Sequence, residues 1–324
     1  MTANPSEDST GHSRAGSSGT KPIVWLPEAP ELYPGLPDGF EFDMYDGTPG
    51  TEPPSIERVE FFVVPYMMGD RPLGLIPSMP NLRVVQTMTA GVENVRPYVP
   101  DGVTLCNARG VHDASTAELT MALILGSLRG IPDFVRAQDA GEWRHRRMNT
   151  LADRSVLILG YGAIGAALER RLQGFECSEI IRVARTARDG VEPLENLPQL
   201  LPRADVVVVL LPNTDQTRGL VDAEFLGRMH DGALLVNVAR GAIVHTDALL
   251  AELRSGRITA ALDVTDPEPP PPGHPLWSVP GLLLSPHVGG NTSAFLPRGR
   301  QLVVDQLRRL ADGEPLVNQV TGAY

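Results

Sequence analysis

Short apolar segments alternate with segments of helical periodicity along most of the chain. Strands are predicted first at residues 23–26, 41–45, 59–64, 82–87 and 104–106, and then at residues 155–159, 179–184, 205–210, 233–238, 258–262 and 282–285. Strands separated by helical segments are typical of parallel sheets with crossover helices. The pattern therefore predicts an α/β protein with a smaller lobe followed by a larger parallel sheet.

The most apolar of the predicted helices spans residues 115–129. It opens with Ser115-Thr116-Ala117-Glu118, a capping-box pattern. Because apolar side chains cover most of its circumference, this helix must be buried, either inside the chain or against a second subunit. It makes a homodimer the favoured assembly.

The turn after the strand at residues 155–159 carries a glycine-rich motif. Gly160 permits a tight turn, Gly162 leaves room for a pyrophosphate, and Gly165 lets the next helix pack closely. That helix, at residues 163–173, points free N–H groups and its positive dipole end at the phosphates. The order strand, helix, strand predicts a dinucleotide site, whose first contacts are Gly160, Tyr161, Gly162, Ala163, Ile164 and Gly165.

The end of the second strand of this unit indicates which dinucleotide binds. NAD-preferring sites place Asp or Glu about twenty residues after the motif, where the carboxylate accepts hydrogen bonds from ribose hydroxyls. Here Arg185 occupies that place, followed by Thr186 and Arg188. Guanidinium groups offer paired donors to a 2′-phosphate. We therefore expect NADP(H) to be preferred over NAD(H), although NAD is possible; the alternative is a solvated basic loop.

Length and composition limit the function classes. The 324 residues exceed one typical core and predict two domains. A formal net charge of -11 disfavours nucleic acid and anionic membrane as partners. The two cysteines lack zinc-ligand spacing, so we expect a cytoplasmic protein with no disulfide and no metal. No apolar run is long enough to span a bilayer, and residues 1–20 are predicted to be a disordered leader.

Arg240, Asp263 and His287 each follow the last apolar residue of a predicted strand. Because ligands of doubly wound sheets bind beyond the carboxyl ends of the strands, these residues should converge on one crevice. Arg240 can fork to the carboxylate and carbonyl of a 2-keto acid. His287 can give a proton to the carbonyl oxygen as hydride arrives, while Glu268 stabilises the imidazolium and orients its ring.

Four ordered motifs resemble those of the D-isomer-specific 2-hydroxyacid dehydrogenases. They are Gly160-Tyr161-Gly162-Ala163-Ile164-Gly165, Asn237-Val238-Ala239-Arg240-Gly241, Asp263-Val264-Thr265-Asp266-Pro267-Glu268-Pro269 and Ser285-Pro286-His287-Val288-Gly289-Gly290. The resemblance spans residues 23–318 and implies a Rossmann-type doubly wound parallel sheet inserted into a smaller flavodoxin-like α/β substrate domain. The implied dinucleotide-binding domain is residues 109–289, and the substrate domain is residues 21–108 plus 290–324.

The resemblance assigns catalysis to Arg240, Glu268 and His287. Each has an alternative role: a structural ion pair, a surface loop position and a structural hydrogen bond, respectively. Further cofactor contacts implied by the family are Thr116, Leu211, Pro212, Val238, Ala239, Asp263 and Gly289. The predicted substrate contacts are Ala90, Gly91 and Val92 of a glycine loop, with Tyr66 and Met67, which alternatively serve only as packing residues.

Together these features predict an NADP(H)-preferring oxidoreductase. It would interconvert a small 2-keto acid of the glyoxylate or hydroxypyruvate type and the D-2-hydroxy acid. One alternative is a catalytically silent dinucleotide-binding regulator, resembling a corepressor, although such a protein needs no proton donor. Another is a reductase of a bulkier 2-keto acid, and pocket volume decides between the substrates.

Overall fold

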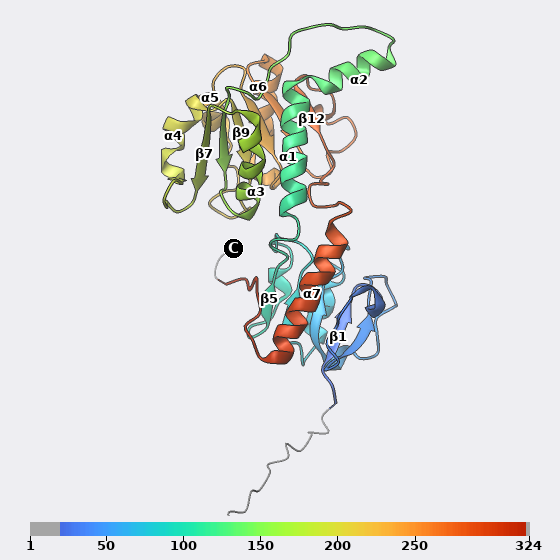
Figure 1. Ribbon diagram of the computed structural model, residues 1–324. Coiled ribbons are helices and arrows are strands. Elements are labelled where there is room, and N and C mark those ends of the chain that lie inside the picture. Colours follow the sequence, from blue (N-terminus) through green and yellow to red (C-terminus); the bar gives the residue numbers. More distant parts are fainter. Residues whose placement is uncertain (1–19, 322–324) are drawn as a thin grey trace, which may run out of the picture.

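A computed structural model describes residues 20–321 and contains two parallel sheets, one in each of two lobes (Figure 1). The predicted leader lies outside the described residues, apart from Thr20. The strands of the small sheet are β1 (Ile23–Leu26), β2 (Glu41–Met44), β3 (Val59–Val63), β4 (Val84–Gln86) and β5 (Thr104–Cys106). The strands of the large sheet are β6 (Ser155–Leu159), β7 (Glu179–Ala184), β8 (Glu192–Pro193), β9 (Val206–Val209), β10 (Leu234–Asn237), β11 (Thr259–Leu262) and β12 (Leu282–Leu284). The prediction of an α/β fold with parallel sheets is confirmed.

The small sheet has the strand order β2-β1-β3-β4-β5, which is the order of flavodoxin-like sheets. Helix α7 (Phe295–Asp312) packs on one face, burying Val303, Val304 and Leu307 against the strands. Within the described residues, the crossovers between these strands contain only short 3-10 helices: η1 (Pro30–Leu32), η2 (Ile56–Arg58), η3 (Leu73–Ser78) and η4 (Arg96–Tyr98). Pro77 lies inside η3, and proline lacks the N–H that a longer helix needs.

The large sheet has the order β12-β11-β10-β9-β6-β7-β8, with every neighbouring pair parallel. The chain direction across the sheet reverses between β6 and β9, which is where ligands bind in such sheets. Both faces are buried: Leu157 and Leu159 pack on one side of β6, and Val156 and Ile158 on the other.

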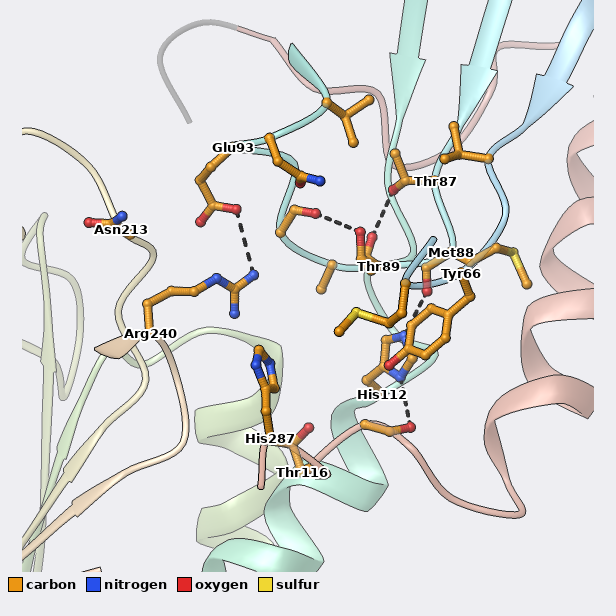
Figure 2. Close-up of a pocket in the computed structure, with 18 of the residues that line it drawn as sticks. Tyr66, Thr87, Met88, Thr89, Glu93, His112, Thr116, Asn213, Arg240 and His287 are labelled. Atoms are coloured by element: carbon orange, nitrogen blue, oxygen red, sulfur yellow. Dashed lines mark hydrogen bonds and ion pairs between the residues drawn. The ribbon is translucent and has the colours of Figure 1, made fainter. Parts of the chain in front are cut away.

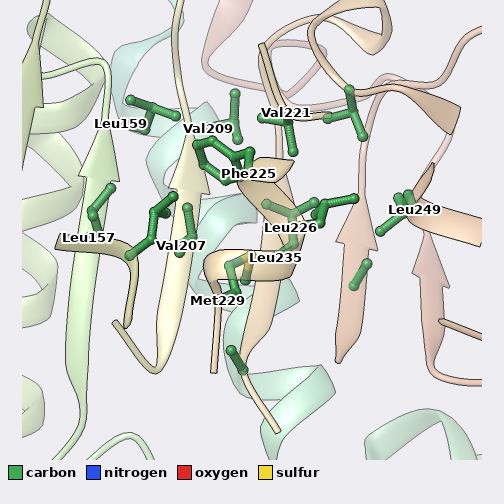
Figure 3. Packing of buried hydrophobic residues seen from close by; sticks show 14 of the residues in the cluster. Leu157, Leu159, Val207, Val209, Val221, Phe225, Leu226, Met229, Leu235 and Leu249 are labelled. Atoms are coloured by element: carbon green, nitrogen blue, oxygen red, sulfur yellow. The ribbon is translucent and has the colours of Figure 1, made fainter. Parts of the chain in front are cut away.

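Helices cover both faces of the large sheet. One face carries α1 (Asp113–Leu128) and α3 (Ala163–Leu172). The other carries α4 (Leu197–Leu200), α5 (Ala223–Arg228) and α6 (Thr246–Ser255), and Figure 3 shows Phe225 and Leu226 of α5 lying over the strands. Helix α2 (Ile131–Asp139) and the segment after it project from the large lobe (Figure 1).

Helix α1 is buried inside the chain, where it packs against α3, β10 and β11. This is one of the two predicted ways to bury the helix, and Glu118 and Ala122 stay exposed on its outer side. The predicted capping box is wrong, because the helix already begins at Asp113, after His112. Ser115 lies inside the helix, and its hydroxyl forms a hydrogen bond with Thr292 instead of capping the backbone.

Candidate active site

Arg240, Asp263 and His287 follow β10, β11 and β12, respectively, and converge as expected for neighbouring parallel strands. All three line a cavity of about 410 Å³ whose walls come from both lobes. Figure 2 shows the side chains of Arg240 and His287 directed into the same space, facing the loop that carries Thr89. The guanidinium and the imidazole therefore share one cavity.

His287 is paired with Glu268. Its Nδ1 lies 2.5 Å from Glu268 Oε1, and the Thr265 N–H donates to Glu268 Oε2 at 3.3 Å. Burial acts to raise the pKa of the Glu268 carboxyl, but the hydrogen bond and charge of His287 hold that pKa below its usual value. Because Nδ1 is engaged, the ring has Nε2 left for a ligand in the cavity.

Asp263 fixes the loop that carries His287. Its carboxylate is buried and accepts hydrogen bonds from the Ser285 hydroxyl at 2.6 Å and from the N–H groups of Val288 and Gly289 at 2.9 and 2.8 Å. The His287 N–H donates to the Asp263 carbonyl at 2.8 Å. His287 itself has a φ of +52°, a left-handed conformation that these bonds hold in place.

Arg240 faces the glycine loop after β4. One guanidinium nitrogen donates to the Ala239 carbonyl at 2.7 Å, and the other lies 3.6 Å from a carboxylate oxygen of Glu93. A Cβ at Gly91 would lie 1.8 Å from Arg240 Nη2, so this position gives the guanidinium its room. The loop is held by Thr89, whose hydroxyl donates to the Gly91 carbonyl at 2.7 Å.

Tyr66 forms the wall of the cavity opposite Arg240. Its ring centre lies 4.3 Å from that of Phe295 and 6.1 Å from that of His112, and Figure 2 shows Tyr66 and His112 side by side. Burial raises the pKa of the Tyr66 phenol, and its hydroxyl has no hydrogen-bond partner within residues 20–321. Met67 follows at the mouth, where 64% of its surface is exposed.

His112 joins the two lobes beneath this wall. Its Nε2 lies 2.8 Å from the Met88 carbonyl, and its Nδ1 lies 3.1 Å from the Gly290 carbonyl. Both ring nitrogens therefore face backbone carbonyl oxygens, and the ring is buried although it lines the cavity. No sequence motif distinguishes His112 from the other histidines outside the His287 motif, because its partners are distant backbone atoms.

A second cavity, of about 590 Å³, runs along the glycine motif. Its lining on the large-lobe side includes Gly160, Gly162, Ala163, Ile164, Gly165, Arg185, Leu211, Pro212, Val238 and Ala239. The facing wall includes residues 318–321, which are held against β5: the Asn107 N–H donates to the Asn318 carbonyl at 3.0 Å, and the Val320 N–H donates to the Leu105 carbonyl at 2.8 Å.

The three motif glycines have different surroundings, which fit a dinucleotide. Gly160 has a φ of +110°, and a Cβ there would lie 2.6 Å from the Leu210 backbone. A Cβ at Gly165 would lie 2.9 Å from the Gly160 carbonyl oxygen, so this glycine brings α3 close. A Cβ at Gly162 would meet no protein atom within 4 Å and would project into open space. That space, at the N-terminus of α3, suits a pyrophosphate.

The cofactor side of the site also contains an unsatisfied polar atom. Asn213 Oδ1 is buried without a hydrogen-bond partner, and Asn213 lines the cavity that holds Arg240 and His287 (Figure 2). Buried acceptors are almost always paired, so a ligand hydroxyl or amide would complete this site. The residues present therefore fit a nicotinamide dinucleotide: the start of α3 would hold its phosphates, and the cavity with His287 would hold its redox ring.

The arginines after β7 lie at the end of the second cavity. Arg185 lines it, and Arg188 donates a hydrogen bond to the Tyr161 carbonyl while its guanidinium lies 5.7 Å from the centre of the Tyr161 ring. Arg188 is thereby tied to the glycine motif. Thr186 is exposed next to them.

Most of the predicted site residues line one of the two cavities, but a few do not. Thr116, Gly289, Ala90, Gly91, Tyr66 and Met67 line the cavity with the catalytic residues. Tyr161, Thr186, Arg188 and Glu268 lie beside the cavities without lining them, and Val92 is buried in the core of the small lobe. The sequence reasoning missed Glu93, Asn213 and residues 318–321, which reach the site only through tertiary contacts.

Two negative findings concern other kinds of function. Among residues 20–321, no helix has both the length and the apolar character needed to cross a lipid bilayer. The same residues contain no cluster of three or more His, Cys, Asp or Glu side chains suited to a metal ion.

Comparison with known proteins identifies related sequences. A family model described as the NAD-binding domain of D-isomer-specific 2-hydroxyacid dehydrogenases matches residues 121–289. A glyoxylate reductase of Aeropyrum pernix is 32% identical over 318 residues, covering 91% of this chain and 93% of that protein. The chain spans only about half the length, 48%, of a matching D-3-phosphoglycerate dehydrogenase of Archaeoglobus fulgidus, at 29% identity.

Solved structures show the same architecture. A D-isomer-specific 2-hydroxyacid dehydrogenase of Xanthobacter autotrophicus Py2, in complex with NADPH and MES, is 31% identical. It aligns with a TM-score of 0.78 over 94% of this chain and 98% of that one. An NADPH-dependent glyoxylate/hydroxypyruvate reductase of Sinorhizobium meliloti, in complex with NADP and malonate, is 27% identical, with a TM-score of 0.77 over 93% and 97% of the two chains.

Proposed function

The chain belongs to the D-isomer-specific 2-hydroxyacid dehydrogenases, a family of NAD(P)-dependent enzymes, and from this premise we propose that it reduces a 2-keto acid to the D-2-hydroxy acid with NADPH. The observation that carries the proposal is the placement of Arg240 and the His287–Glu268 pair in one cavity, next to the glycine-lined groove.

The residues have complementary roles in this reaction. Arg240 binds the substrate carboxylate and polarises the neighbouring carbonyl, which orients the substrate. NADPH, when bound, supplies the hydride. His287 holds a proton on Nε2 and gives it to the carbonyl oxygen, while Glu268 stabilises the charged ring through Nδ1. In the oxidative direction the same imidazole accepts the proton.

The preference for NADP(H) rests on the end of β7. A 2′-phosphate would meet Arg185 and Arg188 there, and the bond from Arg188 to Tyr161 holds one guanidinium beside the glycine motif before the cofactor arrives. The Xanthobacter relative was solved with NADPH, which is consistent with this proposal.

Steady-state kinetics with the two cofactors test the proposal directly. With glyoxylate or hydroxypyruvate as substrate, we expect kcat/KM for NADPH to exceed that for NADH by at least about tenfold, because charge-assisted bonds to the phosphate contribute on the order of 1.5–3 kcal/mol each. The double variant Arg185→Ala/Arg188→Ala should lose most of this preference for NADPH while its kcat/KM for NADH stays at the wild-type value. Arg170→Ala, an exposed arginine of α3, is the matched control. Equal efficiency with both cofactors in the wild type would contradict the preference.

Small substrates are proposed from relatives that are named for glyoxylate and hydroxypyruvate reduction. Both compounds offer the carboxylate and carbonyl that Arg240 and His287 require. The rival function, a silent dinucleotide-binding regulator, would not need the His287–Glu268 pair. It would be favoured if the protein bound NADPH tightly but turned over no 2-keto acid.

We also propose a cytoplasmic homodimer. Both Cys106 and Cys177 are free thiols, as expected in a reducing compartment. Since α1 is buried within the chain, the support for a dimer comes from the projecting α2, where about half of the surfaces of Ile131 and Val135 is exposed (50% and 52%), and from Trp143 after it, which is 95% exposed. The domain boundaries at residues 109–289 likewise stay a prediction.

A further inference from the structure

The substrate cavity extends beyond the reacting groups, and we infer that the enzyme, while reducing glyoxylate and hydroxypyruvate, prefers 2-keto acids with an uncharged, apolar side chain. This inference rests on the proposed function and deepens it. The carboxylate and carbonyl of the substrate bind Arg240 and His287. Glyoxylate consists of little more than this carboxylate and this carbonyl. A larger substrate has its side chain in the remaining space.

The available space exceeds the needs of glyoxylate and a nicotinamide ring. The cavity measures about 410 Å³, and its cofactor side is formed by Ile164, Asn213 and Val238 together with Thr116, Asp263 and Gly289. The opposite side lies in the small lobe, behind the glycine loop. Binding sites of this size usually enclose a molecule with several more heavy atoms than glyoxylate.

Apart from the glycine loop, with Thr87, Thr89, Glu93 and Asn94, the wall of the small lobe is apolar. It is formed by the loop after β3 together with residues from the core: Val64, Pro65, Tyr66, Met67, Met68, Leu73 and Val95. Leu73 and Val95 are buried, and the Tyr66 ring is fixed by Phe295, so this part of the wall is rigid. Met67 and Met68 are exposed at the mouth, where flexible thioether side chains can adapt to an apolar group.

The charges lining the cavity exclude a second anionic group on the substrate. Of the basic side chains, Arg240 and His287 are used by the reacting groups, and both nitrogens of His112 face carbonyl oxygens. The acidic side chains are Asp263, which is bonded to the loop of His287, and Glu93, which lies on the wall beside Arg240. A phosphate or second carboxylate would meet Glu93 without a counter-charge.

Steady-state kinetics with NADPH and a series of 2-keto acids test the inference. The series compares glyoxylate, hydroxypyruvate, 2-oxohexanoate, phenylpyruvate, oxaloacetate and phosphohydroxypyruvate. We expect kcat/KM for 2-oxohexanoate or phenylpyruvate to exceed that for glyoxylate on the order of tenfold to a hundredfold, since each buried methylene contributes about fourfold. The two substrates with a second anionic group should be the poorest.

The possible outcomes separate the inference from the function on which it rests. If glyoxylate or hydroxypyruvate equals the apolar substrates, or if a second anionic group improves turnover, the apolar pocket is refuted while the reductase function stands. If no compound in the series is reduced with either cofactor, the reductase function fails, and the inference fails with it.

Two variants test whether the apolar wall of the small lobe causes the preference for apolar substrates. Met67→Ala should lower the ratio of kcat/KM for 2-oxohexanoate over glyoxylate by about fivefold, because it removes apolar contact from the mouth. Met44→Ala is the matched control: Met44 is 50% exposed on β2 and does not line the cavity, so the ratio should stay at the wild-type value. NADPH affinity checks that both variants are folded. An unchanged ratio in Met67→Ala would contradict the assignment of this wall to the substrate.

Discussion

At the scale of single residues, His287, the proposed proton donor, is held by two sets of contacts. Glu268 orients the His287 ring, and Asp263 fixes the backbone on which that ring stands. The pKa of Glu268 is lowered from 4.5, so its carboxylate is still charged at pH 4.5 and the pair is lost only as the pH falls through the lower value. Throughout the neutral range the imidazole therefore faces a full negative charge.

The variant Glu268→Gln should reduce kcat roughly tenfold to a hundredfold. The neutral amide stabilises the imidazolium less, so the alkaline limb of the pH profile for reduction should move to lower pH. The measurement is kcat/KM against pH, with Glu195→Gln as a control, because Glu195 is exposed and remote from both cavities. A wild-type profile in Glu268→Gln would show that this carboxylate does not act on His287.

At the scale of elements, hydrophobic periodicity and the glycine motif predicted the strands and α3 closely, because each signal is local. Strand β7 begins and ends where the sequence indicated, at Glu179 and Ala184. Helix α1 begins at Asp113, two residues before the predicted start at Ser115. The Ser115 hydroxyl forms a tertiary hydrogen bond with Thr292, which the local sequence does not indicate. The flavodoxin-like strand order followed from the family, but the proline-rich crossovers form 3-10 turns in place of α-helices.

The residues of the candidate site also fall into a group that the sequence predicts and a group that it does not. Arg240, Asp263 and His287 follow strands, so topology alone predicts that they meet. Glu93 and Asn213 could not be predicted, because the first matters only through its 3.6 Å approach to Arg240 and the second through a buried oxygen left without a partner.

The start of α3 allows a test that separates cofactor binding from folding. Gly162→Ala places a methyl group in the open groove at an ordinary φ of -104°, so it should weaken NADPH binding by at least about tenfold and leave the melting temperature nearly unchanged. Gly165→Ala should instead cost about 1–3 kcal/mol of stability, because its methyl group meets the Gly160 carbonyl at 2.9 Å.

Calorimetry and NADPH titration measure the two effects. Gly227→Ala, in α5 with no atom near the added methyl group, is the control and should change neither quantity appreciably. If Gly162→Ala bound NADPH as tightly as the wild type, the pyrophosphate would have to lie elsewhere.

At the scale of the whole molecule, the proposed catalytic cavity has walls from both lobes. Arg240 and His287 come from the large lobe, and the glycine loop and Tyr66 come from the small one. His112 bridges them, with its ring nitrogens facing the carbonyls of Met88 and Gly290. Outside the cavity, the most conspicuous feature is helix α2, which projects from the large lobe (Figure 1).

Trp143→Glu should convert the proposed dimer into a monomer, because a charge replaces a side chain that is 95% exposed in the single chain. Size-exclusion chromatography with light scattering measures the mass. Leu32→Glu, at an apolar side chain that is 45% exposed in the small lobe, is the control and should leave the mass unchanged. A monomeric wild-type protein would refute the dimer outright.

The segment at residues 318–321 bears on how the protein should be handled. Because it pairs with β5 and forms part of the groove along the glycine motif, anything fused beyond Thr321 begins within reach of the dinucleotide. Affinity tags and surface immobilisation through that end would crowd the cofactor entrance and depress apparent affinities.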